Sequence, residues 1–345
     1  MKGGYLAYHL RVNKAVERMI FIDLLGKIGR LFPLDDYKYV GFGGPFLEDF
    51  KLIHNHLGIR NMVSLEIDPE VFKRQEFNLP FDCIRLLREK SGDYIGNYGN
   101  FEEKLILWLD YSEAEDLRDQ LCEFYGVIKK INHGNVVKIT INADVKSLEG
   151  AENENKELKE SGQKKRKEII ESARFEEFRK QVGSAHTASL TARCVEDNKR
   201  YAETLLKILK NISFKAVEGT KKFFPLTSFV YADGQNMLTF TGIVVPKDYD
   251  GYDEFLKKTG LSSYDFILKK DSNTPETIDV PNLSLHEKIC MNRNLPFQKS
   301  NTCVQKSNTC TINFKIDPDA EKSKFKLDNY IKYYRYYPDF AKILV

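Results

Sequence analysis

Cysteine and long apolar runs are both scarce in this chain. Its six cysteines are scattered and no two form a CxxC pair, so we expect no bound zinc or other metal. No apolar run approaches the roughly 20 residues that a membrane-spanning helix needs. The N-terminus also lacks the apolar core of a signal peptide. The sequence therefore predicts a cytoplasmic protein with reduced thiols and no membrane association.

A dominant charge of one sign is also missing. The chain carries 53 basic and 50 acidic residues, a net charge of +3. This balance neither demands nor excludes nucleic acid as a partner. At 345 residues, with 42% hydrophobic content, the chain is long enough for one large globular domain or two.

The clearest positive signal is the stretch at 37–68, YKYVGFGGPFLEDFKLIHNHLGIRNMVSLEID. It is typical of a strand, a glycine turn, a helix and a second strand. Gly41, Gly43 and Gly44 lack a Cβ atom, so the backbone can turn sharply and approach a ligand closely. Glu66 follows the second apolar run, where an acid can accept the hydroxyls of a bound ribose. The stretch predicts a nucleotide or nucleoside site.

Further β-rich runs alternate with helical segments along the first part of the chain. We expect strands at 81–87, 104–109 and 135–142, and a further amphipathic helix at 190–212. This alternation predicts a parallel sheet with helices on both faces. Residues 223–245 then form two β-rich runs around an Asp-Gly-Gln turn, which predicts an antiparallel hairpin. A dinucleotide-binding dehydrogenase domain would continue with a sixth parallel strand instead.

An amphipathic helix is expected at 5–30, before the first strand. One stripe is apolar: Val16, Ile20, Leu24 and Ile28. Another face is basic: Arg11, Lys14 and Arg18. We favour a packing helix with a solvated basic face. The alternative is a polar cluster of Arg11, Asn13 and Lys14 that reaches the ligand pocket and binds an anionic group of the substrate.

Three later segments are less regular. Residues 147–180 are densely charged, which predicts a solvated helical excursion rather than a nucleic-acid contact by the basic run at 164–167. The duplicated QKSNTC motif at 298–311 predicts an enlarged loop with incidental cysteines, Cys303 and Cys310. The tyrosine-rich end at 327–345 could stack bases, but we expect it to dock a last helix on the body.

With these motifs together, the chain resembles the class I S-adenosylmethionine-dependent methyltransferases. The matching segments span about residues 35–245: YVGFGG, SLEID, SGD, LWLDY and the hairpin FVYADGQNMLTFTG. The segments HLRVNKAVER and YYRYYP are also similar to uncharacterised bacterial methyltransferase-like proteins, some of them associated with defence systems. The resemblance implies an α/β fold: a doubly wound, mostly parallel seven-stranded sheet with a terminal antiparallel hairpin.

The resemblance also implies an organisation of the chain. Residues 1–34 would be an N-terminal helical cap, and residues 35–245 a Rossmann-like domain with a charged helical insertion at 147–188. Residues 246–345 would be a C-terminal extension or cap. The implied cofactor is S-adenosylmethionine, and the acceptor and any protein partner are unidentified.

The family pattern assigns roles to individual residues. Gly41, Gly43 and Gly44 would approach the methionine part of the cofactor. Glu66, with Asp68 as a second candidate, would bind the ribose. Asp93 would lie near the adenine, although a helix-capping role is an equal alternative. Asp110 would lie at the methyl-accepting pocket as the general base.

Weaker candidates for the base are Tyr111, His9 and His54. Two departures qualify the resemblance. Phe42 crowds the glycine turn, and the sequence after the fourth strand lacks the Asp/Asn-Pro-Pro-aromatic motif of enzymes that methylate DNA bases. The leading hypothesis is a methyltransferase acting on oxygen or nitrogen. The alternatives are a catalytically weak or inactive scaffold, for instance in bacterial defence, and a nicotinamide-dependent oxidoreductase, against which the missing third glycine argues.

Overall fold

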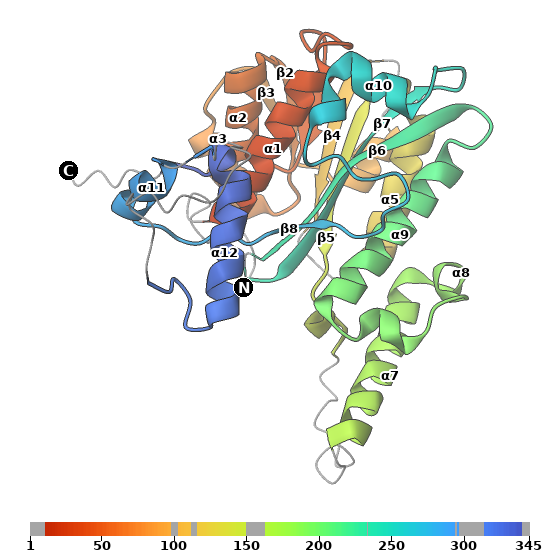
Figure 1. The fold of residues 1–345 in the computed structure, drawn as a ribbon. Helices are drawn as coiled ribbons and strands as arrows, with labels where there is room; N and C mark the ends of the chain where they lie inside the picture. Colours follow the sequence, from red (N-terminus) through yellow and green to blue (C-terminus); the bar gives the residue numbers. More distant parts are fainter. Residues whose placement is uncertain are drawn as a thin grey trace.

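A single eight-stranded sheet organises the molecule, with helices on both faces (Figure 1). The computed structural model describes residues 11–97, 103–111, 116–149, 163–232, 234–293, 295–296 and 314–339. The strand order is β3-β2-β1-β4-β5-β7-β6-β8. The strands are β1 (Lys38–Gly41), β2 (Asn61–Leu65), β3 (Ile84–Leu87), β4 (Leu105–Asp110), β5 (Val136–Asn142), β6 (Lys221–Ala232), β7 (Asn236–Pro246) and β8 (Glu276–Ile278).

The pairing of the strands confirms the predicted fold class. The first five strands are parallel to one another, and β7 pairs antiparallel with both β5 and β6. Strand order reverses at β1, which lies between β2 and β4. Seven strands were expected. The eighth, β8, comes from the C-terminal extension and pairs parallel with β6.

Helices connect most of the strands, α1 (Val12–Ile28) precedes β1, and α11 (Leu285–Asn292) and α12 (Ala320–Tyr333) follow β8. The connecting helices are α2 (Glu48–Leu57), α3 (Pro69–Asn78), α4 (Ser91–Asn97), α5 (Leu117–Lys130), α7 (Gln163–Val182), α8 (Ser184–Thr187), α9 (Asn198–Ala216) and α10 (Tyr252–Thr259). The helix expected to begin at Leu190 begins instead at Asn198. The reason is local, because the Asp197 carboxylate accepts the Arg200 N–H at 2.8 Å and caps the new start.

The two faces of the sheet carry separate cores, as strand alternation requires. In β4, Leu105, Leu107 and Leu109 pack in the core that holds α5 and α9. Ile106 and Trp108 point to the other face, into the core that holds α1 and α2. A parallel sheet covered on both sides explains why this strand is apolar at every position but its last.

A third core joins the C-terminal extension to α1. The predicted apolar stripe of α1 is buried along its length, and Val16 and Ile20 belong to this third core. Tyr330 and Tyr333 of α12 are buried in it, and the Tyr333 ring stacks on Phe266 at 5.4 Å between centroids. The prediction that the tyrosine-rich end docks a last helix on the body is confirmed.

The charged insertion forms α7, which projects from the body as an arm (Figure 1). Its exposed pairs lie one turn apart, as Glu176 and Arg179 do at 3.1 Å. The prediction of a solvated charged helix is confirmed for residues 167–180, and residues 150–162 of the predicted segment lie outside the described residues. The duplicated motif at 298–311, with Cys303 and Cys310, lies outside the described residues.

The described ranges contain neither a membrane-spanning helix nor a cluster of metal ligands. Within them, no helix is long and apolar enough to cross a membrane. Nor do three or more histidine, cysteine or acidic side chains gather there in a way that could hold a metal ion.

Candidate functional site

Three of the predicted site residues follow neighbouring parallel strands. Gly41 ends β1, Glu66 follows β2 and Asp110 ends β4. Gly41 lies opposite Ser64 of β2 and Trp108 of β4. Because strand order reverses at β1, the carboxyl ends of β1 and β4 border the crevice where doubly wound sheets bind ligands.

Side chains of β2 and α3 hydrogen-bond to the glycine loop after β1. The Gly43 N–H donates to Ser64 Oγ at 3.2 Å, and Gln75 Nε2 donates to the Gly44 carbonyl at 2.9 Å. A Cβ atom on Gly43 would lie 2.3 Å from a methyl group of Leu47 and 2.6 Å from Ser64 Oγ. Gly44 has a positive φ of 52°, which favours glycine. At Gly43, therefore, the missing side chain is needed for packing inside the protein.

Glu66 and Asp68 lie in different environments, although the sequence offered both as ribose ligands. Glu66 is half-buried, and its carboxylate accepts the Asp68 N–H at 2.9 Å. Burial raises the pKa of Glu66 above its usual 4.5. Asp68 caps α3 instead, because one of its carboxylate oxygens accepts the N–H groups of Glu70 and Val71 at 2.8 and 3.1 Å.

Asp93 lies on the exposed side of the first turn of α4, where a negative charge suits the helix dipole. Its neighbour Ser91 donates from Oγ to Glu123 at 2.7 Å. This arrangement places Asp93 inside the helix and not at its cap.

Tyr111 directly follows Asp110, the last residue of β4, at the carboxyl end of the strand. Its ring meets Phe42 edge to face, with centroids 5.4 Å apart, and its hydroxyl donates to Glu123. Phe42 therefore packs beside the turn. Burial and the neighbouring Glu123 charge raise the pKa of Tyr111 well above 10.0. At neutral pH the hydroxyl keeps its proton, so Tyr111 is a hydrogen-bond donor and a poor base.

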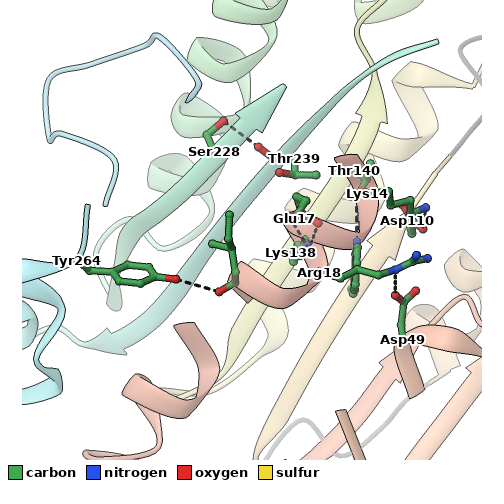
Figure 2. A network of polar contacts seen from close by, with 12 residues as sticks. Lys14, Glu17, Arg18, Asp49, Asp110, Lys138, Thr140, Ser228, Thr239 and Tyr264 are labelled. Carbon is green, nitrogen blue, oxygen red and sulfur yellow. Dashed lines mark hydrogen bonds and ion pairs between the residues drawn. The ribbon is translucent and has the colours of Figure 1, made fainter. Parts of the chain in front are cut away.

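A network of buried charges connects α1 to this edge of the sheet (Figure 2). Lys14 Nζ lies 2.8 Å from Asp110, and their side chains are 8% and 11% exposed. Arg18 of the same helix pairs with Asp49 of α2. Three cations and three anions take part: Lys14, Arg18, Lys138, Glu17, Asp49 and Asp110.

The prediction of a solvated basic face on α1 is wrong. Lys14 and Arg18 are buried because the acids of α2 and β4 lie beneath this face and pair with them. The alternative prediction, a polar cluster of Arg11, Asn13 and Lys14, does not hold as a unit, because Asn13 and Lys14 have different surroundings. Lys14 reaches Asp110, whereas Asn13 donates to the Ala232 carbonyl at 3.2 Å and accepts the Val280 N–H at 2.9 Å. Arg11 lies just before α1.

Sequence reasoning missed three residues of this network, Glu17, Asp49 and Lys138, and Lys138 is the most deeply buried of them. It is fully buried on β5, pairs with Glu17 at 2.8 Å, and its Nζ lies 3.4 Å from the centroid of a Trp108 ring. The signal was present in the strand NVVKITIN, where a lysine stands at an inward position of a run that is otherwise mostly β-branched. Such a lysine must find a carboxylate inside the protein.

The charges around Asp110 set its protonation. Burial alone would raise the pKa of Asp110, but the ammonium of Lys14 and its hydrogen bond, with the charges of Arg18 and Lys138, lower it below 3.8. Asp110 is therefore ionised at neutral pH and is a weak proton acceptor, since basicity falls with pKa. The geometry fits an orienting anion better than a general base.

The histidine candidates are placed elsewhere or lie outside the described residues. His54 lies in the last turn of α2, and its Nδ1 lies 2.9 Å from the carbonyl oxygen of Ile59, just after the helix. That end of α2 leads into the start of β2, the opposite end of the strand from the crevice. His9 lies outside the described residues.

Comparisons with known proteins complete the description of the site. A family model described as "Putative O-methyltransferase" matches residues 6–345. No curated protein matches the chain. Among solved structures, the N-methyltransferase NodS from Bradyrhizobium japonicum WM9 is 10% identical, with 67% of this chain and 97% of that chain covered and a TM-score of 0.36. Trm1 from Pyrococcus horikoshii, solved with S-adenosyl-L-methionine, is 9% identical, with coverage of 70% and 57% and a TM-score of 0.43.

Proposed function

The chain belongs to the family described as "Putative O-methyltransferase", and we propose that it transfers the methyl group of S-adenosylmethionine to an oxygen atom of an acceptor. One observation carries this proposal beyond the family match. The carboxyl ends of β1 and β4 meet where strand order reverses, and Glu66 and Asp110 border the same edge. This is where the doubly wound architecture binds nucleoside ligands.

Glu66 is the residue that we propose for the ribose of the cofactor. Its carboxylate is half-buried, stands directly after β2 and accepts a hydrogen bond from the Asp68 N–H at 2.9 Å. A carboxylate has about four lone-pair positions, so two hydroxyl donors remain compatible with that contact. The glycine loop would border the methionine part, and Asp93 the adenine. The bound cofactor supplies an electrophilic methyl group on a sulfonium centre.

Lys14 and Asp110 are the residues that we propose for the acceptor, with Arg11 beside them. Their ion pair fixes both side chains at the end of β4. The ionised Asp110 would accept a hydrogen bond from the acceptor hydroxyl and would take up its proton as the oxygen–methyl bond forms, since the protonated ether is a far stronger acid than a carboxylic acid. The Lys14 ammonium would attract an electron-rich oxygen of the acceptor. Orientation of the acceptor can supply much of the rate in a direct displacement. The edge formed by Phe42 and Tyr111 would exclude water from the reacting atoms.

The first test is calorimetric titration of the full chain with S-adenosylmethionine and its demethylated product. Glu66→Ala should weaken both affinities by about 1–3 kcal/mol, since the ribose hydroxyls lose a charged acceptor. Asp68→Ala is the matched control. It removes the α3 cap, which lowers stability by about 1 kcal/mol, but should leave the affinity unchanged.

The pH dependence of binding sharpens this test. Glu66 must be ionised to accept two hydroxyls, and its pKa lies above 4.5. Affinity should therefore fall as the pH is lowered through that raised pKa, and Glu66→Ala should remove the dependence. If the cofactor does not bind, or binds the Glu66 variant equally well, the site has been assigned wrongly.

Labelled cofactor separates catalysis from binding alone. Incubation with cell extract, fractionated into small molecules, protein and nucleic acid, should place the label in one fraction as an ester or ether. Base-labile label would identify a carboxylate acceptor. Binding without any transfer would favour the alternative of a methyltransferase-like scaffold.

A further inference from the structure

A polar hollow lies away from the carboxyl ends of β1, β2 and β4. It has a volume of about 230 Å³ and lies between α1, residues 263–266 and the C-terminal end of α12. Its lining includes three basic side chains and three aromatic rings: Lys27, Lys332, Arg335, Tyr264, Phe266 and Tyr336. None of these residues belongs to the crevice of the proposed methyltransferase site.

The three cationic groups are held over the rings of the same hollow. Lys27 Nζ lies 5.2 Å from the Tyr264 centroid, Lys332 Nζ lies 6.0 Å from the Phe266 centroid, and Arg335 Cζ lies 6.0 Å from the Tyr336 centroid. The rings are themselves fixed. Tyr264 donates from its hydroxyl to the Ile20 carbonyl at 3.1 Å, and Phe266 stacks on Tyr333. The aromatic floor therefore limits where the charged groups can move.

Acids accompany two of these three cations. Asp23 and Asp265 also line the hollow, so its lining carries three basic and two acidic side chains, and Glu276 pairs with Lys332 from outside the lining. The Asp23 carboxylate accepts the Tyr336 hydroxyl at 2.6 Å and lies 4.0 Å from Lys27 Nζ. Lys332 pairs with Glu276 at 2.6 Å on the surface. Within the described part of the chain, Arg335 has no carboxylate within 4.0 Å.

We propose that this hollow binds a phosphate group carried by a small ester. A guanidinium with two ammonium groups is the donor set that recognises phosphate oxygens, with the planar fork of Arg335 able to make two parallel hydrogen bonds. Ser263 also lines the hollow and offers a hydroxyl donor. The inference rests on this cluster and not on the proposed methyl transfer.

The volume restricts the size of the ligand. A cavity of about 150 Å³ holds one benzene molecule. The volume of about 230 Å³ therefore admits a phosphate group with a few carbon atoms, and not a dinucleotide. Because Lys332 is 38% exposed, its attraction to an anion is screened by water and salt. The expected affinity is accordingly in the millimolar to sub-millimolar range.

Phosphorus NMR and calorimetry on the full chain test the site with two probes, inorganic phosphate and glycerol 3-phosphate. We expect saturable binding of one equivalent that weakens as salt is raised. Lys27→Ala and Arg335→Ala should each weaken it by about fivefold or more, since each removes a charged donor. Arg335→Lys should restore only part of the affinity, because the fork is lost. Arg60→Ala, an exposed arginine outside the hollow, should change nothing.

The outcomes are decisive in both directions. Binding that is absent, or equal in the Lys27, Arg335 and Arg60 variants, would overturn the proposal, as would preferential binding of a small diamine. The Glu66→Ala variant should bind phosphate normally, and Arg335→Ala should bind S-adenosylmethionine normally. Failure at either site is therefore distinguishable from failure at the other.

Discussion

Helices α1 and α7 both carry Lys, Arg and Glu, yet the two helices place these charges in opposite environments. In α1, the side chains of Lys14, Glu17 and Arg18 are buried beside the crevice and paired across elements. In α7, Arg179 is 47% exposed and pairs with Glu176, one turn away on its own helix. Similar residue types therefore form a buried network in one helix and a solvated surface in the other.

The difference between the two helices is one of dielectric environment. A pair that is taken out of water interacts strongly, but each charge has lost its hydration, so removal of one partner leaves an uncompensated charge. An ion pair exposed to water contributes little to stability, and its loss costs little. The comparison predicts that single substitutions should have large effects in the network at α1 and small effects on the arm.

The largest effect is expected at Lys138. Lys138→Met removes the only ion-pair partner that Glu17 has among the described residues, and the Glu17 side chain is 2% exposed. We expect a loss of about 3–5 kcal/mol in the free energy of unfolding, measured by urea denaturation. Trp108, the single tryptophan of the chain, lies 3.4 Å from Lys138 Nζ and should report the change by fluorescence.

A double variant is the control for Lys138. Lys138→Met combined with Glu17→Leu removes both charges and should recover most of the lost stability, because apolar replacement of a whole buried pair is often neutral. If Lys138→Met lowers the free energy of unfolding by less than about 1 kcal/mol, the charges of the network are solvated by water and not buried.

An intermediate effect is expected at Asp110. Asp110→Asn removes the carboxylate charge 2.8 Å from the ammonium of Lys14 and should lower stability by about 2–3 kcal/mol at neutral pH. The pKa of Asp110 is lower in the folded protein than its usual 3.8, so the stabilisation is present above pH 3.8 and is lost as the pH falls through the lowered value.

The pH dependence separates this charge effect from a general packing defect. The wild-type protein should lose stability steeply in that acid range, and the Asn variant should show a shallower slope there. We also expect methyl transfer to fall more than cofactor affinity. Parallel curves for the two proteins would show that Asp110 does not carry the effect.

The smallest effect is expected on the arm. Lys180 is 76% exposed and lies 3.4 Å from Glu177, so Lys180→Ala should stay within about 0.5 kcal/mol of wild type. The Arg174 side chain is 15% exposed and pairs with Glu149. Arg174→Ala should therefore lower stability by more than Lys180→Ala and by less than Lys138→Met. Hydrogen exchange along α7 is the measurement, because a projecting element can open locally. A large effect of Lys180→Ala would remove the contrast between the helices.

Much of the scaffold was predictable because it follows from local patterns. The glycine turn, the acid after the second strand and the Asp-Gly hairpin signal each depend on neighbouring residues. The same is true of α7, whose charge pairs lie three residues apart. The start of α9 was misplaced because the capping Asp197 was read as part of a longer helix.

The amino-acid sequence by itself determined the order of strands and helices, the buried stripe of α1 and the position of Glu66 and Asp110 after their strands. Only the tertiary structure decided which charges are buried. Lys14 and Asp110 are 96 residues apart in sequence, and Glu17 and Lys138 are 121 apart. The periodicity of a helix or a strand cannot predict a pairing between residues so far apart in sequence. Such a pairing follows from the packing of α1 on the sheet, which removes water from both partners at once and makes each necessary to the other.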